Sequence, residues 1–292
     1  MLNQIVPWYG SKPALSRHIL PEFGPHRAYW EPLTGGFGMI FKKERCRFET
    51  LNDLHGDMIN LARTVASSVL CAALVRRLSR RLNCEATHKD ALERQREPFV
   101  EGVDRAADFF CVCWMSMNGY AGTTSSQSFA TRFKNSGDSK PSKFRAALAS
   151  IRAWHDRLQN VTILQRDGFD VLGRIADEAG TLIYCDPPYV VKGGKYRHDF
   201  VAEDHARLAA ALARFQQARV IVSYYDHPLL DQLYAGWHKR ILSEWTHHPQ
   251  NGVKKVKPPE ILLINGPSLA ASVPPSTTSS TRKRARAQQL AV

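Results

Sequence analysis

The sequence predicts an α/β protein whose sheet is interrupted by a mostly helical segment. Short apolar runs of strand composition occur before residue 55 and again after residue 160, and the region between them carries apolar residues at helical spacing. A glycine-rich turn follows the first strand and an acidic residue ends the second, an arrangement that builds parallel nucleotide-binding sheets. With 292 residues, 43% of them hydrophobic, the chain can form one large domain or two modest ones.

The N-terminal elements predict a unit that binds a nucleoside. A strand over 27–32 leads through a glycine-rich turn into a short helix over about 39–44 and a second strand over 48–53. Asp53 lies 22 residues after Glu31, which suits a carboxylate that binds a ribose diol. The phosphate-binding GxGxxG pattern is absent from this turn. A ligand with a nucleoside but no pyrophosphate therefore fits the unit better than NAD does.

The rest of the chain divides into helices, further strands and a tail. Apolar residues at helical spacing fill 60–82, 89–100 and 106–115, and a polar loop rich in Gly, Ser, Thr and Asn follows over 118–142. Later strands are predicted at 161–164, 181–185, 219–223, 240–242 and 260–263, with a helix at 205–217. We therefore predict an α/β domain of residues 1–59 and 146–265, an inserted domain of residues 60–145, and a disordered basic tail over residues 266–292.

Four residues that follow the buried strand at 181–185 carry the clearest chemical signal. They are Asp186, Pro187, Pro188 and Tyr189. The exocyclic amino group of a nucleobase is a poor nucleophile because its lone pair is delocalised into the ring. Asp186 and the Pro187 carbonyl can each accept a hydrogen bond from it, and Tyr189 offers a flat face to a base removed from its helix. The motif therefore predicts methylation of a nucleobase amino group.

The charge of the chain favours a polyanionic partner. The formal net charge is +13 and the pI is about 9.6. The tail holds four basic residues and no acid, so the rest of the chain still carries +9. Its basic cluster fits a nonspecific nucleic-acid arm and a solubilising segment equally well. Basic residues in the polar loop and after the motif are candidates for DNA contacts: Arg132, Lys134, Lys192, Lys195 and Arg197.

Cysteine usage and the N-terminus predict a cytoplasmic protein. The six cysteines show no CxxC pair and no zinc-ligand spacing, so we expect reduced packing residues and no metal. The sequence shows neither a secretory signal nor an apolar run of membrane-spanning length. We expect neither a membrane nor an obligatory protein partner.

The motifs together resemble the DNA adenine N6-methyltransferases related to the bacterial Dam enzymes, especially their phage-borne members, within the class alpha amino methyltransferases. Residues 7–12 resemble the family's N-terminal Trp-x-Gly-Gly-Lys element, 31–36 its cofactor loop, 52–53 its ribose-binding turn and 186–189 its catalytic motif. Further matches lie at 118–119, 167–169 and 260–265. All of them follow the family's order, over about residues 5–265.

The resemblance implies a Rossmann-like sheet that uses S-adenosylmethionine, with an inserted target-recognition domain. The implied reaction is site-specific methylation of the N6 amino group of a flipped adenine in DNA, in a bacterial or phage-infected cell, as in restriction-modification. The implied catalytic residues are Asp186, Pro187, Pro188 and Tyr189. The implied cofactor site contains Trp8, Gly10, Lys12, Glu31, Pro32, Gly35, Asp53, Asp167, Phe169 and Asp186, and Asn118 joins the residues expected at DNA.

The chain departs from the family pattern in its glycine loop. Aligning Gly35 with the first glycine of that loop places Phe37 at the second glycine and Leu33 at the usual aromatic position. A shifted register and a reshaped cofactor pocket both fit this departure. A DNA-binding relative with impaired catalysis is therefore one alternative function.

Some of the expected cofactor residues, and the substrate itself, allow a second interpretation. Trp8 also fits a buried anchor, Asp53 a helix cap, and Asp167 with Phe169 an ordinary turn carboxylate and core aromatic. Asp186 favours adenine, since cytosine amino (N4) methyltransferases typically begin the motif with serine and RNA or protein enzymes with asparagine. A cytosine-amino enzyme remains the nearest alternative in chemistry.

Overall fold

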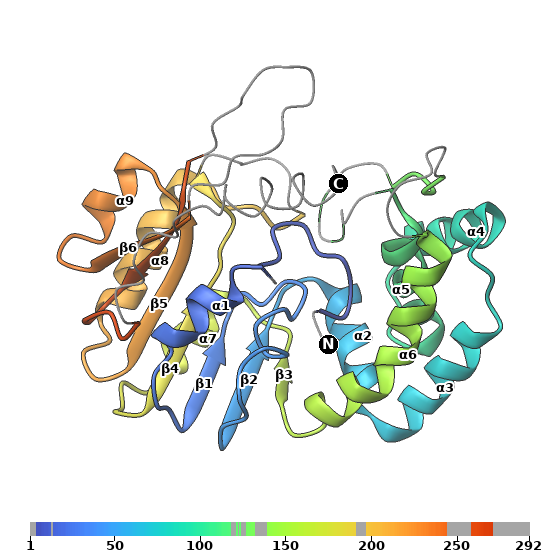
Figure 1. The fold of residues 1–292 in the computed structure, drawn as a ribbon, viewed down its shortest axis with the longest axis horizontal. Helices are drawn as coiled ribbons and strands as arrows, with labels where there is room; N and C mark the ends of the chain where they lie inside the picture. The colour runs from blue at the N-terminus through green and yellow to red at the C-terminus, as the bar shows by residue number, and fades with distance from the viewer. Residues whose placement is uncertain are drawn as a thin grey trace, which may run out of the picture.

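Seven strands form a single sheet in the part of the chain that the structure describes (Figure 1). This computed structural model describes residues 4–12, 14–117, 121, 123, 127–131, 139–190, 197–243 and 258–270. The strands are β1 (Ala28–Glu31), β2 (Phe48–Asn52), β3 (Thr162–Leu164), β4 (Thr181–Cys185), β5 (Arg219–Tyr225), β6 (His238–Ser243) and β7 (Glu260–Ile264). The sheet confirms the predicted α/β, Rossmann-like class.

The strand order reverses between β1 and β4. The order across the sheet is β3-β2-β1-β4-β5-β7-β6, with parallel pairing from β3 to β5 and antiparallel pairing of β7 with both β5 and β6. The chain therefore moves outward in one direction through β2 and β3 and in the other through β5. Ligands of open α/β sheets bind at the carboxyl ends of the strands beside such a reversal.

The central strands are buried on both faces, as their continuous apolar runs predict. Leu182 and Tyr184 of β4 belong to one hydrophobic core, whereas Ile183 and Cys185 belong to the other, since side chains alternate along a strand. Helices α1 (Ser16–Ile19), η1 (Leu20–Glu22) and α2 (Gly56–Ala66) contribute to the first core. Helices α7 (Gly168–Arg174), α8 (Ala202–Ala213) and α9 (Pro228–Leu233) contribute to the second.

Helices α2 to α6 pack together beyond β3, at one end of the sheet, and form what we call the helical unit (Figure 1). After α2 it contains α3 (Ser68–Ser79), α4 (Glu85–Arg96), α5 (Val103–Met115) and α6 (Lys140–Leu158). Phe110 and Phe144 of this unit lie in the same core as Tyr29 of β1. The unit and the sheet therefore share a hydrophobic interior. The helices of the unit run from residue 56 to 158, and the inserted domain of residues 60–145 stays a prediction.

Two predicted helices were wrong in detail. The segment predicted as a helix over 39–44 is a turn in which the Lys43 N–H donates to the Met39 carbonyl at 3.0 Å. The Ile40 carbonyl, which a helix would pair with the Glu44 N–H, accepts a hydrogen bond from Arg157 Nε at 3.0 Å. The helix predicted over 60–82 breaks at Ser67, whose extended backbone and side-chain oxygen cap α3.

Part of the predicted tail is held against the sheet. The Leu269 N–H donates to Glu22 at 2.8 Å, and Arg219 Nη2 donates to the Pro267 carbonyl at 3.1 Å. Residues 271–292 lie outside the described residues, so their disorder stays a prediction. Among the described helices, no single one is long and apolar enough to cross a membrane; α2 and α3 meet the length and composition only as a pair bent by 107°.

Candidate active site

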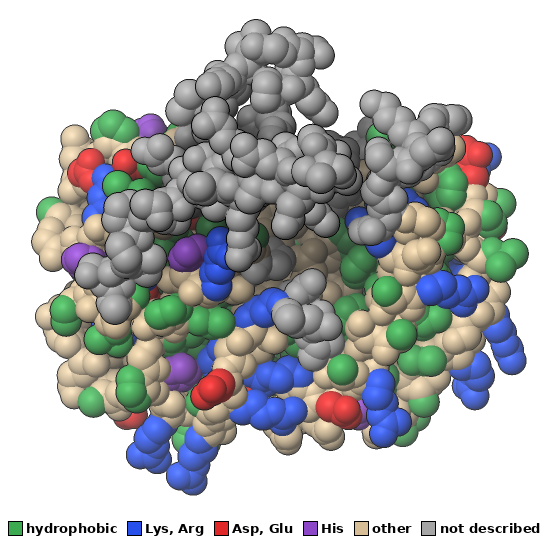
Figure 2. Space-filling model, viewed as in Figure 1, with side chains coloured by type: hydrophobic (Ala, Val, Ile, Leu, Met, Phe, Trp, Pro, Cys, Tyr) green, Lys and Arg blue, Asp and Glu red, His purple; other side chains and the backbone are tan. Residues whose placement is uncertain are grey.

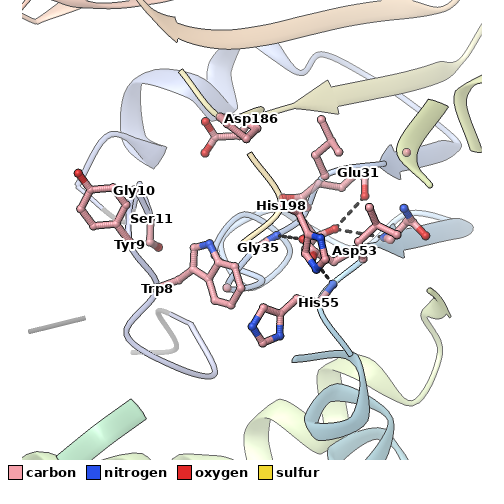
Figure 3. A pocket seen from close by; sticks show the side chains of 18 of the residues that line it. Trp8, Tyr9, Gly10, Ser11, Glu31, Gly35, Asp53, His55, Asp186 and His198 are labelled. Atoms are coloured by element: carbon pink, nitrogen blue, oxygen red, sulfur yellow. Dashed lines mark hydrogen bonds between the residues drawn. The ribbon is translucent and has the colours of Figure 1, made fainter. Parts of the chain in front are cut away.

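A cavity of about 930 Å³, including its open mouth, lies where β1, β2 and β4 end (Figure 3). The N-terminal segment, residues 8–12, forms one wall, and the loops after β1 and β2 form the wall opposite. This is the sheet edge at which the strand order reverses, as expected for a ligand site. The predicted site residues that line the cavity are Trp8, Gly10, Lys12, Glu31, Gly35, Asp53, Asp186 and Pro188.

Asp53 ties the glycine loop to the start of α2. Its Oδ2 accepts a hydrogen bond from the Gly35 N–H at 2.8 Å, and its Oδ1 accepts one from the His55 N–H at 2.8 Å. The N-cap of α2 is His55, whose Nδ1 accepts from the Met58 N–H at 3.3 Å. Asp53 therefore precedes the cap and does not form it, and each of its oxygens retains a lone pair toward the cavity.

Trp8 packs directly on the glycine loop. A Cβ added to Gly35 would lie 2.6 Å from Trp8 Nε1, and one added to Gly36 would lie 2.4 Å from Trp8 Cβ. Gly35 also has φ +56°, in the left-handed region that favours glycine. Trp8 is half-buried and lines the cavity, so it is both an anchor for the loop and part of the wall.

Phe37 explains how the chain accommodates its irregular loop. Its φ is +61°, the only positive value among the described residues other than glycine. The glycine loop that this segment resembles has its second glycine at this position, and the left-handed backbone is the conformation that a glycine there would adopt freely. The Phe37 side chain is fully buried in the core. The loop therefore keeps a glycine-like backbone, and a buried aromatic ring compensates for the strain.

Asp186 stands at the cavity edge directly after β4, with its side chain 24% exposed. Lys12 Nζ lies 2.8 Å from both of its carboxylate oxygens. Burial raises the pKa of Asp186; attraction to Lys12 opposes this rise and repulsion by Glu260 reinforces it. Burial alone would lower the pKa of Lys12, but Asp186 and Glu260 reverse that effect and raise it. Lys12 is thus a buried cation held by two carboxylates.

Tyr189 lies behind Asp186 rather than in the cavity wall. Its side chain is buried, and its hydroxyl contacts Asp186 Oδ1 at 3.2 Å and, more closely, Glu260 Oε1. Lys12 Nζ is 4.7 Å from the ring centroid, and the Tyr225 ring packs edge-on at 4.6 Å. The structure therefore places the Tyr189 ring in a packed site, and its stacking on a base stays a prediction.

Glu31 is a buried carboxyl at the end of β1. It accepts a hydrogen bond from the Tyr29 hydroxyl at 2.8 Å and is 2% exposed. Burial raises the pKa of Glu31 to about 8; the Tyr29 hydrogen bond opposes the shift, and the negative charge of Asp186 adds to it. A cation in the cavity would favour the ionised form of Glu31.

Five residues predicted at the cofactor or catalytic site do not line the cavity: Pro32, Asp167, Phe169, Pro187 and Tyr189. Asp167 is the N-cap of α7 and accepts a hydrogen bond from the Phe169 N–H at 2.7 Å. The Phe169 ring stacks on Phe200 at 5.8 Å. Phe200 and not Phe169 reaches the cavity, and contacts of Asp167 and Phe169 with a cofactor stay a prediction.

Several cavity residues were not predicted from the sequence. They include His55, His198 and Phe200. His55 lies two residues after the ribose-binding turn and just before an apolar helical run, but histidine is not among the preferred N-cap residues, so the sequence carries no signal for its place. Burial lowers the pKa of His55, and its ring lies 5.4 Å from Trp8 and 6.4 Å from His198. His198 and Phe200 lie in a polar stretch whose pattern gives no structural signal.

Most of the residues predicted to contact DNA fall outside the described residues: Asn118, Arg132, Lys134, Lys192 and Lys195. Arg197 is described, is 60% exposed and lies 3.9 Å from Asp57. Figure 2 shows Lys and Arg side chains spread over the middle of the visible face and over the helical unit. The positive charge of the folded part is thus displayed at its surface.

A family model described as "D12 class N6 adenine-specific DNA methyltransferase" matches residues 8–248. The chain belongs to this family. Its relatives include the retron Ec67 DNA adenine methylase of Escherichia coli, 23% identical over 85% of this chain and 83% of that protein. Another is the DNA N-6-adenine-methyltransferase of Escherichia phage P1, 24% identical over 80% of this chain and 31% of that longer protein. A solved structure of an MtNAS mutant aligns over 42% of each chain at 15% identity and a TM-score of 0.21.

Membership of the D12 class confirms the predicted family and the predicted enzyme class, a DNA adenine methyltransferase. It favours adenine N6 over the cytosine-amino alternative.

Proposed function

We propose that this D12-class enzyme transfers the sulfonium methyl group of S-adenosylmethionine directly to the N6 nitrogen of a flipped adenine in DNA. The proposal rests mainly on the position of Asp186. It stands at the rim of a ligand-sized cavity at the reversal point of the sheet, beside the loop that Asp53 organises.

The cavity suits a cationic nucleoside. Its lining contains the carboxyl groups of Glu31, Asp53 and Asp186, and the ammonium group of Lys12 is already paired with Asp186. In the proposed complex, Asp53 accepts hydrogen bonds from the ribose hydroxyls, and Glu31 faces the positively charged end of the cofactor. Phe200 takes the place at the nucleoside that the sequence suggested for Phe169.

Asp186 and the Pro187 carbonyl would accept hydrogen bonds from the two N–H groups of the adenine amino group. These bonds localise the nitrogen lone pair and aim it at the methyl carbon. S-adenosylmethionine, when bound, supplies a methyl group on a cationic sulfonium that leaves as a neutral thioether. Asp186 need not be a strong base, because the methylated nitrogen is acidic enough to lose its proton easily.

We expect DNA to contact both the helical unit and loops that contain basic residues. We assign target recognition to the helical unit, including Asn118, Arg132 and Lys134 of the polar loop that follows α5. Lys192, Lys195 and Arg197 follow the catalytic motif and would contact phosphates near the flipped base. The net charge of +13 supports salt-dependent binding of a polyanion.

Nucleoside analysis tests the proposed reaction. The purified chain is incubated with S-adenosylmethionine carrying a labelled methyl group and with DNA of mixed sequence, and the DNA is digested to nucleosides. We expect the label in N6-methyladenine. Label in N4-methylcytosine would select the cytosine alternative, and no label under conditions where the cofactor binds would contradict the proposal.

A further inference from the structure

Glu260 is a buried carboxylate that the fold brings to the catalytic motif from a distant part of the chain. It is the first residue of β7 and lies opposite Tyr225, the last residue of β5. Because β7 runs antiparallel to β5, its first residue reaches the edge at which the parallel strands end. The Glu260 side chain is 5% exposed there.

One carboxylate oxygen of Glu260 lies close to three hydrogen-bond donors. Its Oε1 accepts a hydrogen bond from the Tyr189 hydroxyl and one from Ser223 Oγ at 2.8 Å, and it lies 3.5 Å from Lys12 Nζ. Tyr189 and Lys12 also contact Asp186. Glu260 and Asp186 therefore share both of these partners.

The Tyr189 hydroxyl, which contacts both carboxylates, determines how many further hydrogen bonds Asp186 can accept. Tyr189 has one hydroxyl hydrogen and two carboxylate neighbours, of which Glu260 is closer than Asp186 Oδ1 at 3.2 Å. We place the hydroxyl hydrogen on the contact with Glu260, the nearer acceptor. Without Glu260, the Tyr189 hydroxyl would donate to Asp186, whose two oxygens already accept from Lys12 at 2.8 Å each. This added donor would occupy a further lone pair of the group that has to accept the adenine N–H.

We infer that Glu260 is a positioning residue for methyl transfer: it holds the Tyr189 hydroxyl so that Asp186 keeps an acceptor site for the amino group. The inference rests on the proposed role of Asp186. It assigns Glu260 no contact with the substrate or the cofactor, so its removal should affect transfer and leave cofactor binding nearly unchanged.

Steady-state kinetics of Glu260→Gln tests the inference, because glutamine keeps the shape and removes the charge. We expect kcat to fall by about 10- to 100-fold, a typical cost for losing a supporting partner, with the Kd for S-adenosylmethionine changed by less than about threefold. The acid limb of the kcat profile should also move to lower pH. The charge of Glu260 raises the pKa of Asp186. Among the described residues, the other charged or titratable neighbours of Asp186 are Lys12, Glu31, Tyr184, Cys185, Tyr189, Tyr224 and Tyr225.

Glu260→Asp is the second variant, since it keeps the charge and shortens the side chain. It should lower kcat while leaving the acid limb at the wild-type pH. Asp231→Asn, at an exposed carboxylate on α9, is the matched control and should behave as the wild type. Wild-type kcat in Glu260→Gln, or a loss of kcat with an unmoved acid limb and a lower unfolding midpoint, would overturn the inference. An inactive wild type would instead contradict the proposed function.

Discussion

At the scale of single residues, Phe37 shows how the chain departs from its family without losing the loop. Its backbone occupies the left-handed region, which costs an L-residue with a side chain about 1 to 2 kcal/mol. Burying its ring gains more, since truncating a buried phenylalanine costs about 3 to 5 kcal/mol. The ring therefore outweighs the strain, and a phenylalanine can stand where relatives have glycine.

Truncation of Phe37 separates these two effects. Phe37→Ala loses the ring and keeps the strain, whereas Phe37→Gly loses the ring and relieves the strain. We expect both variants to be less stable than the wild type, with Phe37→Gly more stable than Phe37→Ala by about 1 kcal/mol, the reverse of the usual order. Urea titration measures the difference. A Phe37→Ala protein as stable as Phe37→Gly would show that the backbone is unstrained.

At the scale of elements, the sequence predicted the strands better than the helices. Apolar runs such as 181–185 identify strands because a buried parallel strand is apolar on both faces. The helix α6 was missed although Phe144, Ile151 and Trp154 follow helical spacing, because the preceding polar loop obscured where it begins. Helix boundaries depend on caps such as Ser67, which are weak local signals.

The sequence predicted those residues of the candidate site that directly follow a parallel strand. Asp53 and Asp186 follow parallel strands, and the carboxyl ends of such strands meet at one edge. Glu260 could not be placed in this way, because its position depends on the antiparallel direction of β7. The contact of Lys12 with Asp186 likewise depends on how the N-terminal segment folds over the sheet. Sequence patterns do not encode either arrangement locally.

At the scale of the whole molecule, buried charges join the N-terminal part of the chain to the sheet. Glu22, fully buried in η1, pairs with Arg219 of β5 at 3.2 Å and with Arg240 of β6 at 2.6 Å. Lys12 similarly joins the N-terminal segment to β4 through Asp186. Buried ion pairs cost desolvation but are strongly destabilising when one partner is removed. The site is thus part of the network that holds the fold together.

Glu31 makes the stability of the whole molecule depend on pH. Its pKa rises from 4.5 in the unfolded chain to about 8 in the fold. The unfolded chain therefore releases this proton first, so stability is lost as pH rises from about 4.5 to about 8 and is level above that. The full loss is on the order of 5 kcal/mol. Glu31→Gln cannot titrate and should escape this loss, as urea titrations at low and high pH would show.

Glu178→Gln, at an exposed site, is the control for the change of charge, and its pH dependence should match that of the wild type. If Glu31→Gln lost as much stability between acidic and alkaline pH as the wild type does, the buried carboxyl would not be the source of the dependence.

The central claim is that Asp186 serves methyl transfer and not cofactor binding. Single-turnover methylation and calorimetric binding of S-adenosylmethionine, measured on Asp186→Ala and on the isosteric Asp186→Asn, test it most directly. We use Asp170→Ala, at an exposed carboxylate on α7, as the control. The account predicts that both Asp186 variants lose at least about 10²-fold in transfer rate and bind the cofactor within about threefold of the wild type. Transfer at the wild-type rate, or loss of cofactor binding together with transfer in both folded variants, would contradict it.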